Sequence, residues 1–192
     1  MSKIMARIEL DPVQLGNLEV GWWKAHNEKD KPRMARLLVE QNVALYGFTP
    51  EEAQEALKSL AQGVNYHDTK EWDKAVNANT IYYQRVKKKT GLDFDPKEVA
   101  ELEVGWWQLH DELEENPDKS QLAEAFAKLY AVQFGVDVKS MAEAGKLKAE
   151  ATREHDLAED PSIPSNEIDS HWNKAKKLLI DFYSELKTAI NQ

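Results

Sequence analysis

The stretch Leu18-Glu19-Val20-Gly21-Trp22-Trp23, with His26 three residues further on, occurs twice in this chain of 192 residues. It returns as Leu102-Glu103-Val104-Gly105-Trp106-Trp107 with His110, at an offset of 84 residues. A phrase repeated at a fixed offset is the sequence signature of a duplicated structural unit. The repeated stretch therefore predicts that the chain is built from two related halves.

A second shared phrase follows each copy of the first. His67-Asp68-Thr69-Lys70-Glu71 matches His155-Asp156-Leu157-Ala158-Glu159, at an offset that has grown to 88 residues. Trp72 and Trp172 are 100 residues apart, and the added residues of the second copy include the proline-rich segment 160–165. Proline-rich segments form loops, so the insertions lengthen loops while the helix faces stay in register.

Helix signals recur along the chain, and strand signals are nearly absent. Asp11-Pro12 and Asp95-Pro96 each place a capping carboxylate before a proline at the first helical position. Gly47 and Gly135 stand where a left-handed C-terminal cap is expected. Apolar residues between these signals recur at helical spacing, so we expect an all-α fold.

The repeat suggests how these helices are organised. We expect an internally duplicated helical bundle, in which two four-helix repeats pack with pseudo-two-fold symmetry. The first repeat covers residues 1–90 and the second covers residues 91–192. The linker at 87–91 is short, so the repeats are expected to pack against each other and can form one compact domain.

Composition narrows the classes of function. The formal net charge of −9 disfavours nucleic acids and anionic membranes, because both select basic surfaces. No run approaches the ~20 apolar residues of a membrane span, and the N-terminus lacks a signal-peptide core, so a cytoplasmic location is expected. Cysteine is absent, so any metal site must use histidine and carboxylates, which suit iron, zinc or manganese.

The first phrase places aromatic and polar side chains on one face of a helix. Residues seven apart lie two turns apart, about 10 Å along the axis, so Glu19 and His26 line two levels of one face. The candidate cofactor-binding residues are Trp22, Trp23, Trp106 and Trp107. Large aromatic side chains dominate protein cores, so packing is the simpler interpretation of these tryptophans.

The second phrase has better geometry for holding a metal ion. His67 and Glu71 are four residues apart, which puts one side chain above the other on a helix. Two histidines and a carboxylate can hold iron or zinc with open coordination positions. The candidate metal ligands are His26, His67, Glu71 and Glu19 in the first half, and His110, His155, Glu159 and Glu103 in the second. They predict two mononuclear sites or one dinuclear site, unless the shared residues only pack and hydrogen-bond.

Two functions stay open on the sequence alone. The first is a small metalloenzyme, an oxidoreductase or a hydrolase, whose divalent metal activates water or dioxygen. The second is a non-enzymatic binding or accessory module, whose tryptophan-rich faces bind a protein partner or an apolar ligand. Exposure separates the two, because a binding face requires the tryptophans to form an apolar patch on the surface.

Overall fold

The computed structural model describes residues 9–113 and 116–192, and within these ranges the chain is helical with no strand. The all-α prediction is confirmed. In chain order the elements are α1 Pro12–Asn27, α2 Lys31–Tyr46, α3 Pro50–Asp68, α4 Trp72–Thr90, α5 Pro96–Glu112, α6 Ser120–Phe134, the short 3-10 helix η1 Val138–Met141, α7 Ala142–Glu159 and α8 Ser165–Ile190. Among these helices none is both long enough and apolar enough to cross a bilayer.

The helix ends follow the local chemistry of the sequence. The side chains of Asp11 and Asp95 accept hydrogen bonds from backbone N–H groups in the first turns of α1 and α5. Gly47 and Gly135 end α2 and α6 with φ angles of 69° and 68°. This left-handed conformation costs glycine little because it has no Cβ. The predicted caps of these four helices are therefore confirmed.

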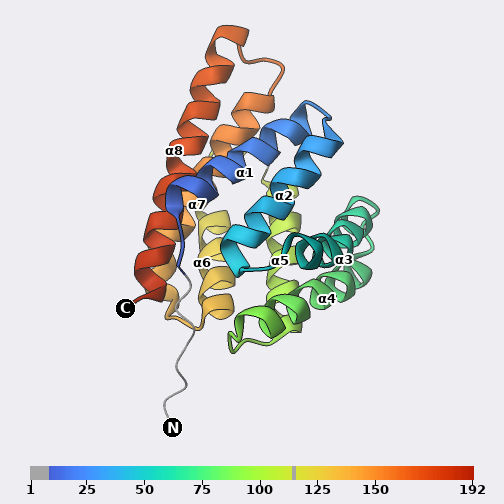
Figure 1. The fold of residues 1–192 in the computed structure, drawn as a ribbon. Coiled ribbons are helices and arrows are strands. Elements are labelled where there is room, and N and C mark those ends of the chain that lie inside the picture. Colours follow the sequence, from blue (N-terminus) through green and yellow to red (C-terminus); the bar gives the residue numbers. More distant parts are fainter. Residues whose placement is uncertain (1–8, 114–115) are drawn as a thin grey trace.

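Helices that are neighbours in the chain pack against each other, and the two ends of the helical array also meet (Figure 1). α3 packs on α4, and α7 packs on α8 as a long hairpin that projects beyond the other helices. α4 packs on α5, and α8 packs on α1. Among the described residues, the most extensive contacts between the first and second halves of the sequence are therefore those of α4 with α5 and of α1 with α8.

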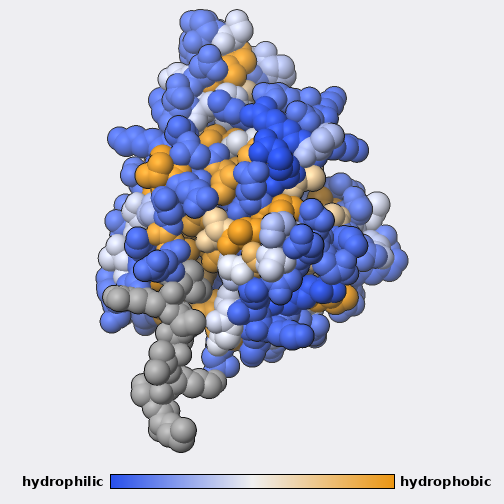
Figure 2. All heavy atoms as spheres, in the orientation of Figure 1, coloured by the Kyte–Doolittle hydropathy of each residue, from blue (hydrophilic) through white to orange (hydrophobic). Residues whose placement is uncertain are grey.

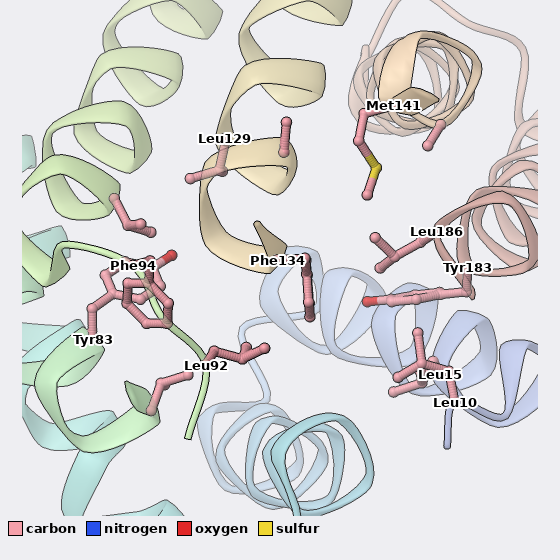
Figure 3. Packing of buried hydrophobic residues seen from close by; sticks show 14 of the residues in the cluster. Leu10, Leu15, Tyr83, Leu92, Phe94, Leu129, Phe134, Met141, Tyr183 and Leu186 are labelled. Carbon is pink, nitrogen blue, oxygen red and sulfur yellow. The ribbon is translucent and has the colours of Figure 1, made fainter. Parts of the chain in front are cut away.

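The main hydrophobic core draws on both halves of the sequence (Figure 3). Tyr83 and Phe94 lie on one side, Tyr183 and Leu186 lie on the other, and Phe134 lies between the two groups. All five side chains are at most 5% exposed. Full burial of such side chains contributes roughly 1.5–3 kcal/mol each, so this cluster holds helices from both halves around a shared interior.

The α6–α7 pair packs more closely than the α2–α3 pair. A Cβ added at Gly145 of α7 would lie 2.3 Å from the carbonyl oxygen of Ala123 and 2.9 Å from the Cβ of Ala127, both on α6. The residue 88 positions before Gly145 is Leu57, which is half-buried on α3. α3 contacts α2 much less than α7 contacts α6.

Replacing Gly145 with alanine is expected to destabilise the protein by about 1–3 kcal/mol, the usual cost of overpacking a core. The matched control is Gly105→Ala on α5, where a Cβ would meet nothing within 4 Å. That change should instead stabilise the fold by about 0.5–1 kcal/mol through helix propensity. Urea denaturation of both variants measures the difference, and equal effects would show that the α6–α7 approach is not tight.

Candidate functional site

The four tryptophans of the first phrase lie mostly within the fold. Trp23 is 7% exposed, and Trp22, Trp106 and Trp107 are half-buried. Within each pair the two indole rings meet edge to face, at centroid distances of 6.0 Å and 6.3 Å. This burial favours packing over an exposed tryptophan-rich binding face.

His155 on α7 lies between two tryptophans from opposite ends of the chain. Its ring centroid is 4.9 Å from that of Trp23 on α1 and 5.6 Å from that of Trp172 on α8. The ammonium group of Lys24 lies 5.5 Å from the Trp172 ring on α8. Rings at these distances interact favourably beyond simple burial, so His155 helps to join α1, α7 and α8.

His67 on α3 has a similar environment at the other contact between the halves. Its ring lies 5.3 Å from that of Trp72 on α4 and 5.5 Å from that of Trp107 on α5. Its Nε2 atom is 3.2 Å from a carboxylate oxygen of Asp111, also on α5. His67 therefore contacts a tryptophan from each half of the sequence, as His155 does.

Asp156 is the centre of a polar cluster at the end of α7. One carboxylate oxygen lies 3.1 Å from Nε2 of His110 and 3.3 Å from Nδ1 of His155. The other carboxylate oxygen is 3.3 Å from the ammonium group of Lys119, and the second ring nitrogen of His155 is 3.2 Å from Glu159. Three of the predicted ligands, His110, His155 and Glu159, are thus brought together, with Asp156 in their midst.

The charges within this cluster stabilise one another. Burial alone would lower the pKa of His155, but the contacts with Asp156 and Glu159 raise it to about 9. Burial alone would raise the pKa of Asp156, yet its two histidine partners hold it well below its usual range. The cluster therefore carries an imidazolium and a carboxylate at neutral pH, as expected of an ion-pair network.

The first half does not form the same cluster. His26 and Asp68 are exposed, and Glu71 pairs with Lys74. The expectation that His67 and Glu71 share one helix is wrong, because α3 ends at Asp68 and Glu71 is the cap residue of α4. Between them Lys70 adopts a left-handed conformation with φ of 58°, which interrupts the helix.

The predicted metal ligands do not surround a common point. Across residues 9–113 and 116–192, no group of three or more histidine and carboxylate side chains could hold a metal ion. The ring nitrogens of His155 face two different carboxylates, and the Nε2 atom of His110 faces Asp156. The metal-site hypothesis therefore stays a prediction that gains no support from this geometry.

Glu19 and Glu103, the two additional predicted ligands, each accept a hydrogen bond from a tyrosine. The hydroxyl group of Tyr183 donates to Glu19 at 2.7 Å, and that of Tyr83 donates to Glu103 at 2.9 Å. Glu19 also forms an ion pair with Lys148 of α7. Burial raises the pKa of Glu103, and the Tyr83 hydrogen bond opposes this only in part. Glu19 thus has a cation in contact, whereas Glu103 is held by the hydrogen bond from Tyr83.

Sequence reasoning missed the cations of both polar clusters. Lys119 and Lys148 are each 5% exposed, which is rare for lysine. Lys148 precedes His155 by seven residues and so lies on nearly the same face of α7, which was the one available signal. His171, which is not among the predicted ligands, also belongs to a polar pair, with its Nδ1 atom 2.7 Å from a carboxylate oxygen of Glu154.

A groove with a volume of about 800 Å³ runs along α2. One face of α2 forms its floor, and its edges are lined by one residue of α1 and two residues from the start of α3. The lining residues are Gln14, Ala35, Arg36, Val39, Glu40, Val43, Ala44, Pro50 and Gln54. Figure 2 shows hydrophobic residues gathered over α1 and α2 in the middle of this face, with hydrophilic residues around them. The groove therefore combines an apolar floor with a polar rim.

Replacing Glu103 with glutamine is expected to stabilise the protein at pH 7. A raised carboxyl pKa means that the folded state disfavours the ionised form, so the wild type loses stability as pH rises through that pKa. The gain should fade below about pH 4.5, where the glutamate is protonated in both states. Urea denaturation across pH 4–8 measures this gain in stability. The control is the Glu101→Gln variant, because Glu101 is exposed on the same helix. A loss of stability at pH 7 would show that the ionised form is favoured.

A scan against protein-family models, a search of curated proteins and a search of solved structures each found no match for this chain. The chain is therefore not placed in a family.

Proposed function

We propose that the protein is a non-enzymatic helical binding module, and that it binds an α-helix of a partner protein in the α2 groove. The groove itself carries this proposal. Its volume is about 800 Å³. From Ala35 to Ala44 its floor extends about 14 Å at the helical rise of 1.5 Å per residue, which matches two to three turns of a docked helix.

The character of the groove lining also supports an amphipathic helix as the partner. Val39 and Val43 are half-buried and offer apolar surface one turn apart. Arg36 and Glu40 stand beside them on the rim, exposed and paired with each other at 2.8 Å. An apolar centre with a polar rim is the usual anatomy of a protein interface, and an amphipathic helix fits such a groove through its apolar face.

The metalloenzyme alternative has no comparable observation in its favour. Several of its candidate ligands instead join helices, as His67 does through Asp111 and His155 does through Trp23 and Trp172. Glu71 pairs locally with Lys74. The tryptophan-rich surface of the original binding hypothesis is also replaced, because Trp23 is buried and the other three tryptophans are half-buried. A cytoplasmic location and the exclusion of nucleic acids stay predictions from composition.

The duplicated architecture belongs to the same proposal. We infer that residues 1–90 and 91–192 are two four-helix repeats related by a pseudo-two-fold axis. Support comes from the equivalent packing of α4 on α5 and of α8 on α1. Further support comes from His67 and His155, each of which lies between one tryptophan from its own half and one from the other. In this arrangement, α2 and α6 occupy equivalent places.

The Ala35→Glu variant tests the proposed binding site. Ala35 is exposed, so the fold should be unaffected, but a bound helix would bury the new charge. We expect binding of a helical peptide to weaken at least tenfold, which corresponds to about 1.4 kcal/mol. The probes are a peptide of residues 142–159 and a leucine-enriched version of it, titrated while the Val39 and Val43 methyl resonances are recorded.

The matched control is Ala142→Glu, at another exposed alanine. This variant should bind the probes as the wild type does. If neither peptide shifts the Val39 and Val43 resonances, or if both glutamate variants weaken binding equally, the groove is not a helix-binding site.

A further inference from the structure

The face of α2 that forms the groove floor has a counterpart on α6. Residues 88 positions after Ala35 and Val39 are Ala123 and Ala127 of α6. On α6 this face is covered, because α7 packs there and Ala127 is only 4% exposed. On α2 the corresponding face is open enough to form a groove. The packing of α7 on α6 therefore indicates how a partner helix could pack on α2.

The face of α7 that packs on α6 carries small residues four positions apart. Gly145 lies against Ala123 and Ala127, and Ala149 shares a buried cluster with Leu122 and Phe126 of α6. At Gly145 the two backbones come so close that an added Cβ would meet the Ala123 carbonyl oxygen. Small side chains allow this approach, because the distance between helix axes depends on the side chains at the contact.

α3 does not reproduce this contact on α2. Leu57 of α3 corresponds to Gly145, and α3 makes far fewer contacts with α2 than α7 makes with α6. Since α3 supplies only Pro50 and Gln54 to the groove lining, the floor is left for another helix.

The charges at the groove rim do little to select the partner helix, so the size of its side chains matters more. Arg36 and Glu40 carry opposite charges and are already paired, so neither sign is strongly preferred at the rim. The valines of the floor, Val39 and Val43, stand where α6 has alanines. A helix must therefore present small side chains toward them to lie as close to α2 as α7 lies to α6.

We infer that the partner helix presents a stripe of glycine or alanine residues to α2, spaced three to four residues apart as on α7. This inference rests on the proposed function and adds the chemistry of the partner's contact face. Leucine or aromatic residues along that stripe would hold the two helix axes apart and leave Val39 and Val43 incompletely covered.

Two peptides titrated into the full-length protein test this inference. The first has the sequence of α7, residues 142–159, and the second carries Gly145→Leu and Ala149→Leu in that peptide. We expect the first peptide to bind at least ten times more tightly, with methyl shifts at Val39 and Val43, and we expect the Ala35→Glu protein to lose this binding.

The possible outcomes separate the two proposals. Equal or tighter groove binding by the leucine peptide overturns the small-residue inference but leaves the helix-binding site intact. Shifts at the Ala127 methyl group instead of Val39 show exchange with the protein's own α7, which also counts against the inference. Absence of any shift at Val39 and Val43 with either peptide overturns both proposals.

Discussion

A buried ion pair between Lys148 and Glu19 connects α7 to the first helix of the chain. Each side chain is 6% exposed, and Tyr183 of α8 donates a hydrogen bond to the same carboxylate. Charges removed from water are tolerated only when they are paired and hydrogen-bonded. α1, α7 and α8 must therefore adopt one mutual arrangement for these groups to be satisfied, and the contact between the two halves at α1 and α8 depends on it.

The residues shared by the two copies serve mainly this joining of helices. His155 and His67 each contact tryptophans from both halves. Glu19 and Glu103 each accept a hydrogen bond from a tyrosine hydroxyl group. The differences between the copies matter as much as the similarities. Gly145 allows α7 to lie close against α6, whereas Leu57 holds the corresponding position on α3. The groove lies along α2, where α3 makes no comparably close contact.

The sequence predicted what local chemistry determines and missed what tertiary packing determines. The all-α fold and the caps at Asp11, Asp95, Gly47 and Gly135 are confirmed, because a cap requires only a few neighbouring residues. The break at Lys70 was missed because a lysine in a left-handed conformation carries no sequence signal. The burial of Lys119 and Lys148 was missed because their partners Asp156 and Glu19 are 37 and 129 residues away.

The candidate site was likewise predicted only in part. The repeated phrases predicted His110, His155 and Glu159 as ligands, and these residues do share a cluster, but Asp156 at its centre was not among the predicted ligands. Its role depends on α5 and Lys119, which helix geometry within α7 cannot reveal. The groove was not anticipated at all, because an uncovered helix face becomes visible only when the neighbouring helices are placed.

The most direct test of this account is a double-mutant cycle on Glu19 and Lys148, measured by urea denaturation. Lys148→Met alone should cost about 3–5 kcal/mol, because it leaves a buried carboxylate without its cation. Adding Glu19→Gln should recover much of that loss, giving a coupling energy of about 1 kcal/mol or more. Additive effects, or a Lys148→Met variant as stable as the wild type, would show that the ion pair does not hold α1 against α7 and α8.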